Sequence, residues 1–153
     1  MSANGSDSPR YHALLELLRT ADALWNSSRL FFARWHLSPS QFNVLNLLHG
    51  QPAGLSQIEL GRSLIMHRSN VTGLVDRLEK RGLLQRHEVA RDRRAYRIVL
   101  TAAGRKLVQH ILPEYYHVAE EVWNGFPAHS AKRWAADLKR LGANAERVTR
   151  SQP

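Results

Sequence analysis

The chain has 153 residues, a formal net charge of +9 and no cysteine. This length allows one domain with a real core, and the lack of thiols excludes disulfides, thiolate metal sites and cysteine redox sensing. No apolar run approaches the ~20 residues needed to span a bilayer, and the N-terminus lacks the features of a signal peptide, so we expect a cytoplasmic protein.

The first predicted element is a long helix. Residues 1–9 before it are small and polar, cannot bury anything and are expected to be disordered. From Arg10 to about Arg34 the apolar residues recur at the spacing of one helix face.

Two capping boxes predict the next two helices. Residues 38–41 read Ser-Pro-Ser-Gln and begin a helix that runs to about Leu48. Residues 56–59 read Ser-Gln-Ile-Glu and begin a short helix that ends at about Leu64.

The helix predicted from about His67 to Arg81 has two different faces. Its apolar side chains, at Val71, Leu74, Val75 and Leu78, recur at helical spacing and mark a buried stripe. The opposite face carries hydrogen-bonding side chains of the kind that read base edges and phosphates: His67, Arg68, Ser69, Asn70, Thr72 and Arg77. Gly82 then stands in the position of a C-terminal cap. With the short helix before it, this element forms a helix-turn-helix pair.

Two short strands are predicted next, at Leu83–Val89 and Tyr96–Thr101, joined by the cationic residues 91–94. A helix followed by such a ribbon is a winged helix. Residues 62–97 carry ten basic and four acidic side chains, which is two thirds of the net positive charge of the chain. A basic run can be merely a solvated face, but this one coincides with a groove-sized helix and a hairpin tip, which favours DNA as the partner.

The last two helices are predicted from Thr101 to about Asn124, with a bend at Pro113, and from about Ala128 to Arg147. Together with the first helix they hold more apolar surface than a module of this size needs for its own core. A second copy of the chain would cover that surface, although a monomer that folds its helices back on itself is the alternative.

The expected fold is mainly α with a small β-hairpin. Residues 37–101 form the winged helix-turn-helix domain, and residues 10–36 and 102–147 form a helical dimerisation region.

Two segments of the chain carry a resemblance to a known family. The run from Asn70 to Arg86, followed by residues 92–101 and by Gly104, resembles the signature of MarR-type transcription regulators in order and spacing. The resemblance implies a homodimer that binds a pseudo-palindromic operator and is often released by a small molecule. A DNA-binding regulator without a small-molecule effector and a zinc-responsive regulator of the same type are the alternatives.

The predicted DNA contacts divide by type. Arg68, Ser69, Asn70 and Thr72 are expected at bases or adjacent phosphates, and Arg62, Arg77 and Arg86 at phosphates. At the wing tip, Arg91, Arg93 and Arg94 suit the narrow minor groove. In relatives the residue matching Asp92 braces the wing, so Asp92 is expected to orient Arg94.

The resemblance also implies an effector pocket, whose candidate lining residues are Trp25, Arg29, Phe32, Trp35, His36 and Phe42. A weaker candidate is a zinc site on the helix after the wing, where His110, Glu114, His117 and Glu121 lie near one face. A solvated helix face shows the same spacing. The sequence shows no phosphate loop, nucleophile elbow or paired carboxylates, so we expect neither an enzyme nor a cofactor.

Overall fold

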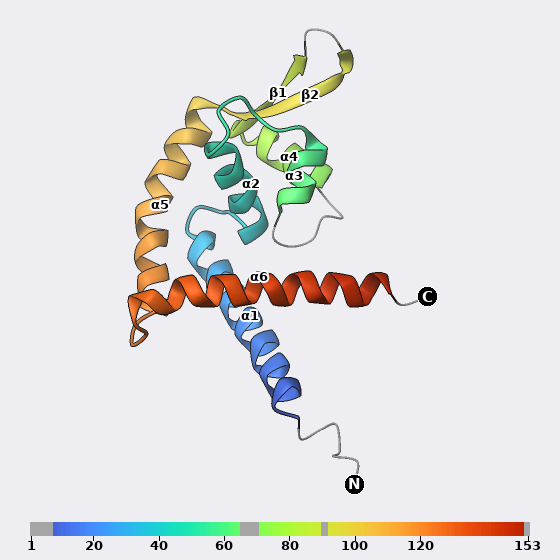
Figure 1. The fold of residues 1–153 in the computed structure, drawn as a ribbon. Helices are drawn as coiled ribbons and strands as arrows, with labels where there is room; N and C mark the ends of the chain where they lie inside the picture. The colour runs from blue at the N-terminus through green and yellow to red at the C-terminus, as the bar shows by residue number, and fades with distance from the viewer. Residues whose placement is uncertain (1–7, 65–70, 90–91, 152–153) are drawn as a thin grey trace. The chain divides into compact units, whose positions relative to one another are not determined.

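A computed structural model of the chain describes residues 8–64, 71–89 and 92–151 (Figure 1). The elements in chain order are α1 (Pro9–Ala33), α2 (Pro39–His49), α3 (Gln57–Ser63), α4 (Val71–Lys80), β1 (Leu84–Val89), β2 (Asp92–Leu100), α5 (Ala102–Val122) and α6 (Ala128–Arg150). The two strands pair in an antiparallel hairpin. This is the predicted fold class. None of the helices in the described ranges has the length and apolar character that a membrane crossing requires.

The chain divides into two compact units, residues 1–109 and 110–153. The first unit holds α1 to α4, the hairpin and the first residues of α5. The second holds the rest of α5 and all of α6. Helix α1 therefore belongs to the same compact unit as the winged module. That residues 10–36 and 102–147 form a dimerisation region stays a prediction.

Both predicted capping boxes are present. The hydroxyl oxygen of Ser38 accepts from the backbone N–H of Gln41 at 3.1 Å, and the Gln41 side chain accepts from the Ser38 N–H at 2.8 Å. Ser56 and Glu59 make the same pair of bonds, at 3.2 and 2.7 Å. These bonds satisfy helix N–H groups that lack an intrahelical partner, so α2 and α3 begin where the local sequence predicts.

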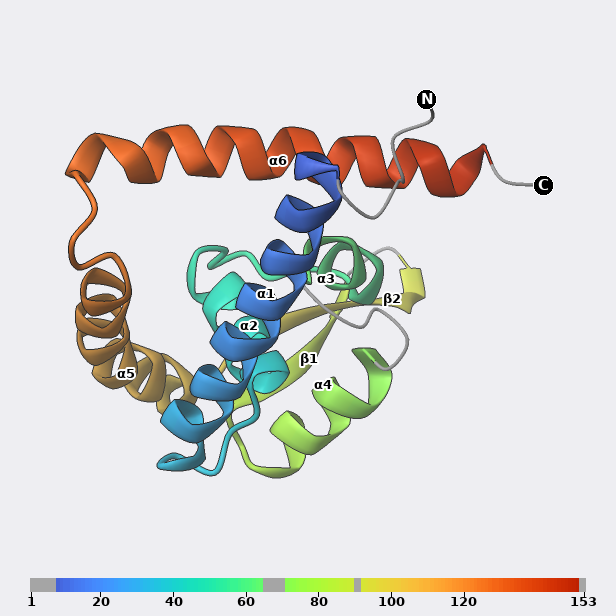
Figure 2. The ribbon, with the colours of Figure 1, turned by 90° about the horizontal axis from the view of Figure 1, so that it is seen from below.

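The core of the first unit forms around α2, which contacts α1, α3, α4 and β2 (Figure 2). The predicted apolar stripe of α4 is buried, with Val75 and Leu78 completely inaccessible to solvent. On α2, Val44 and Leu45 are equally inaccessible. Since full burial of such a side chain contributes about 1.5–3 kcal/mol, this core holds α4 with its polar face outward.

The end of α4 and the start of α5 are joined by Thr101. Its hydroxyl accepts from the Gly104 N–H at 3.0 Å, as an N-cap does, and donates to the carbonyl oxygen of Gly82 at 2.6 Å. Gly82 has the positive φ of +68° expected of the predicted cap. α5 continues through Pro113.

The hairpin differs from the prediction in one respect. β2 begins at Asp92, not at Tyr96, so the expectation that residues 92–94 belong to the connecting turn is wrong. The register shifts between Glu88 and Val89, and Val89 then pairs with Asp92. Because of this irregularity, the backbone pairing of the two strands continues toward the tip of the hairpin. The sequence pattern indicated a strand only over the residues where apolar and polar side chains alternate.

In the second unit, α6 extends to Arg150 and none of its residues is buried. The rings of Trp123, Phe126 and Trp134 meet edge to face at centroid distances of 5.7 to 6.3 Å. Leu138 and Leu141 follow Trp134 along the same helix face and are also exposed.

Candidate nucleic-acid interface

The structure describes part of the predicted DNA-contacting set. His67, Arg68, Ser69, Asn70 and Arg91 lie outside the described residues. For Asp92, Arg93 and Arg94 the backbone is described, in β2. The predicted roles of these residues stay predictions. Arg62, Thr72, Arg77 and Arg86 are described with their side chains.

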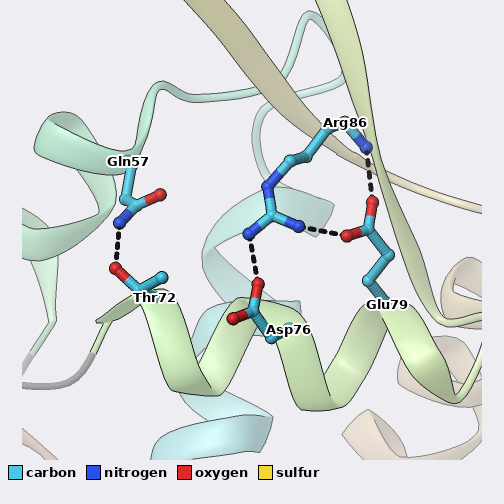
Figure 3. Close-up of polar contacts among 5 residues, drawn as sticks. All are labelled: Gln57, Thr72, Asp76, Glu79 and Arg86. Carbon is cyan, nitrogen blue, oxygen red and sulfur yellow. Dashed lines mark hydrogen bonds and ion pairs between the residues drawn. The ribbon is translucent and has the colours of Figure 1, made fainter.

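Thr72 and Arg77 occupy the exposed face of α4, opposite its buried stripe. The hydroxyl oxygen of Thr72 accepts a hydrogen bond from the side-chain amide of Gln57, on α3, at 2.5 Å (Figure 3). The first turns of the two helices of the helix-turn-helix pair are therefore joined through side chains as well as through the core.

Arg86 on β1 is held by two carboxylates of α4 (Figure 3). Its guanidinium donates to Asp76 at 2.5 Å and also pairs with Glu79, whose other oxygen accepts the backbone N–H of Arg86 at 3.1 Å. The hydrogen bond to Asp76 and the charge of Glu79 raise the pKa of Arg86. The Arg86 side chain is 25% exposed and its guanidinium points at α4 (Figure 3), so the geometry favours a brace between the wing and the helix over a phosphate contact.

The base of the wing is fixed to the segment between α2 and α3. Leu55 pairs with Ile98 through two backbone hydrogen bonds, of 3.1 and 2.8 Å. The guanidinium of Arg97 donates to the carbonyl oxygens of Ala53 and Gly54, at 3.0 and 2.7 Å. Gly54 has a φ of +76°, and a Cβ there would lie 2.6 Å from the Ile98 carbonyl oxygen, so the close approach needs glycine.

The C-terminal end of α4 is tied to the segment that follows α1. Arg81 donates to the carbonyl oxygens of His36 and Trp35, at 2.6 and 3.1 Å. His36 has a φ of +53°, in the left-handed region that few residues other than glycine adopt. Helix α4 is thus held at its start by Gln57, in its middle by Arg86 and at its end by Arg81.

An open hollow of about 550 Å³ lies beside this last contact. It is lined by Trp25, Arg29, Ala33, His36, Leu37, Ser38 and Pro39. Of the predicted pocket residues, the structure brings together Trp25, Arg29 and His36.

The other three predicted pocket residues lie elsewhere. Phe32 and Phe42 are buried and stack at a centroid distance of 4.2 Å, so they belong to the core. Trp35 packs on Phe31 at 5.2 Å and under the guanidinium of Arg34 at 4.5 Å. Aromatic residues at helical spacing are equally suited to a core and to a pocket, and only packing separates the two.

The weak zinc candidate finds no support in the described part of the chain, where no group of three or more His, Cys, Asp or Glu side chains is placed to hold a metal. His117 pairs instead with Glu121 at 3.5 Å, one helical turn away. A contact between two exposed side chains one turn apart is typical of a solvated helix face.

The sequence reasoning missed two residues of this surface, Gln57 and Arg81. Gln57 is the first residue of a helix in a capping box, and Arg81 follows a basic helix end. The local sequence around each residue indicates only a helix end, whereas their hydrogen-bond partners are 15 and 45 residues away.

Comparison with known proteins gives one consistent match. Residues 36–95 match the MarR family. The chain is 28% identical over 137 residues to the HTH-type transcriptional regulator PapX of Escherichia coli, covering 88% of this chain and 84% of PapX. The crystal structure of the transcriptional regulator SlyA is similar, with a TM-score of 0.76 and 25% identity over 87% of this chain and 93% of SlyA.

A third similarity concerns the fold alone. CouR of Rhodococcus jostii RHA1, in a crystal structure with bound p-coumaroyl-CoA, has a TM-score of 0.75 and 23% identity over 92% of this chain and 95% of CouR.

Proposed function

We propose that the chain is a DNA-binding transcription regulator of the MarR family, which residues 36–95 match, and that it binds a pseudo-palindromic operator in the cytoplasm as a homodimer and represses transcription. The observation that carries this proposal is the presentation of α4. Its buried stripe and three side-chain ties hold the helix with Thr72 and Arg77 exposed, and the segment of residues 62–97, which contains this helix and most of the hairpin, carries two thirds of the net positive charge.

In such a dimer each α4 enters a major groove, and the two half-sites lie about 10 base pairs apart. Thr72 and the residues just before it would contact bases or neighbouring phosphates, and Arg77 would anchor a phosphate. Arg94, at the wing, is the leading candidate for the minor groove.

The proposed dimer is supported by apolar side chains that the single chain leaves exposed. On α1 these include Leu14, Leu18 and Leu30, which are 53%, 59% and 79% exposed. On α6 the stripe from Trp134 to Leu141 is likewise uncovered. Large exposed apolar faces on several helices are typical of surfaces that a second subunit buries.

We further propose that a small aromatic ligand releases the operator by binding in the hollow lined by Trp25, Arg29 and His36. An indole ring with a guanidinium and an imidazole suits an aromatic compound that carries an acidic group. CouR, which shares the fold, binds an aromatic acyl thioester. His36, whose carbonyl oxygen accepts a hydrogen bond from Arg81, also lines the hollow, so a ligand bound there would lie beside a residue that is bonded to the end of α4.

The DNA-binding proposal is tested by selecting duplexes from a randomised pool with the purified chain and measuring their affinity against salt. If a dimer neutralises ~6–10 phosphates, affinity should fall by ~10³–10⁵-fold between 50 and 200 mM salt. An enriched palindromic motif is expected. A chain that enriches no motif, or that binds with no salt dependence, would contradict the proposal.

The ligand proposal is tested separately, by a thermal-shift screen of aromatic carboxylates and their thioesters. A compound that raises the melting temperature should also weaken binding to the selected duplex, and Arg29→Met should reduce both effects. Tight DNA binding with no stabilising compound would favour the alternative, a regulator without an effector.

A further inference from the structure

Gln57 is placed with little freedom although its side chain is exposed. It is the first residue of α3, immediately after Ser56, and the capping box of Ser56 and Glu59 fixes the backbone of that turn with two hydrogen bonds. α3 in turn packs on α4 and β2. The amide of Gln57 therefore starts from a defined position at the beginning of the helix-turn-helix pair.

The direction of the bond to Thr72 restricts what the threonine hydroxyl can do. The Gln57 Nε2 donates and the Thr72 Oγ1 accepts (Figure 3). A hydroxyl has one proton to donate and two lone pairs, so a lone pair is now used and the proton is directed away from Gln57. The proton of Thr72 therefore stays available for an acceptor other than Gln57.

Gln57 keeps hydrogen-bonding capacity of its own. One amide proton is engaged by Thr72, which leaves the second amide proton and the carbonyl oxygen Oε1 for another partner. Both side chains lie at the solvent-exposed side of the pair. A bond between two exposed neutral groups adds little to folding stability, since water replaces it readily.

We propose that Gln57 is a further DNA-contacting residue, which orients the Thr72 hydroxyl to donate to an acceptor of duplex DNA and makes its own contact beside it. This inference rests on the proposed function. The acceptor chemistry is shared by phosphate oxygens and by the O6, O4 and N7 atoms of the base edges in the major groove.

The two sources of acceptor differ in sequence dependence. A phosphate contact contributes equally on every duplex, whereas a base-edge contact contributes only on the matching sequence. Comparing a selected duplex with a mixed-sequence duplex therefore separates them.

The experiment measures both affinities for Gln57→Met, Thr72→Val and the double variant. Methionine retains the length of glutamine without its hydrogen bonds, and valine retains the shape of threonine without its hydroxyl. Gln109→Met, at an exposed position of α5, is the matched control. Thermal unfolding of each variant reports any structural effect.

The expected result is a loss of about tenfold in affinity for the selected duplex with Gln57→Met. Thr72→Val should then cost less than about twofold in the Gln57→Met background, because the hydroxyl has lost its orientation. Melting temperatures should match the wild type, and Gln109→Met should bind normally. Loss on the selected duplex alone indicates a base edge, and equal loss on both duplexes indicates a phosphate.

Unchanged affinity of Gln57→Met on both duplexes would overturn the inference, and so would strictly additive effects of the two substitutions. A loss of affinity that follows a lowered melting temperature at both positions would also overturn it, because the contact would then be structural. These results leave the proposed function intact, since the wild-type chain still selects its motif. Failure of the wild-type chain to select any duplex would instead refute the proposed function itself.

Discussion

The guanidinium of Arg81 donates a hydrogen bond to the backbone carbonyl oxygen of His36 at 2.6 Å. Arg81 follows the last residue of α4, and His36 lines the hollow beside the end of α1. One residue therefore connects the end of α4 to the wall of the proposed ligand site. A ligand that displaces His36 would alter the position of α4 through this bond.

Arg81→Met should weaken this connection. The substitution removes two hydrogen bonds to carbonyl oxygens and should lower the free energy of unfolding by about 0.5–1.5 kcal/mol per bond at most. Any ligand found by thermal shift should then reduce DNA affinity less in the variant than in the wild type. Lys80→Met, at the neighbouring exposed position, is the control. An undiminished ligand response in Arg81→Met would show that the signal takes another route.

Arg86 and Arg77 should behave differently when each is replaced by methionine. Arg86→Met leaves Asp76 and Glu79 without their shared partner and should cost about 1–2 kcal/mol of folding stability. Arg77→Met should change stability by less than about 0.5 kcal/mol but reduce the slope of DNA affinity against salt by about one. Chemical denaturation and salt titration distinguish these effects. Equal stability of the two variants would contradict the bracing role of Arg86.

Replacing each of two helical glycines, Gly104 and Gly142, by alanine compares a crowded position with an open one. A Cβ at Gly104 would lie 1.9 Å from the carbonyl oxygen of Leu83, whereas a Cβ at Gly142 meets nothing within 4 Å. Gly104→Ala should therefore destabilise the chain by at least about 1–3 kcal/mol, because backbone must move. Gly142→Ala should stabilise it by up to about 1 kcal/mol through helix propensity. Thermal unfolding of both variants checks the prediction, which fails if Gly104→Ala is tolerated.

The contribution of the capping box at the start of α3 to folding stability should depend on pH through Glu59. The backbone and hydroxyl hydrogen bonds with Ser56, followed by the charges of Arg97 and Arg62, hold the pKa of Glu59 below its ordinary value of 4.5. A lowered pKa in the folded state means that the unfolded chain binds the proton more tightly. The contribution of Glu59 is therefore complete above the ordinary pKa and is lost as the pH falls through the folded value.

Glu59→Gln should accordingly lower the free energy of unfolding at neutral pH. The difference in this free energy between the variant and the wild type should become smaller as the pH falls. Urea unfolding at pH 7 and at successively lower pH measures that difference. A gap that stays constant or widens as the carboxyl is protonated would exclude this role of Glu59.

The amino-acid sequence by itself determined the features whose causes lie within a few residues of one another. The capping boxes at Ser38 and Ser56, the cap at Gly82 and the buried stripe of α4 were all predicted correctly. Each depends on hydrogen bonds or helix periodicity inside one element, so the local pattern is sufficient. The order of these elements was enough to predict the fold class.

Only the tertiary structure decided which side chains meet across elements. Arg86 was predicted at a phosphate, yet it faces Asp76 and Glu79 because β1 packs on α4. Phe32 and Phe42 were predicted in a pocket, yet they stack in the core. An arginine or a phenylalanine suits either environment equally well. Its partner is chosen by the packing of elements distant in the chain, and that packing leaves no periodic signal around the residue itself.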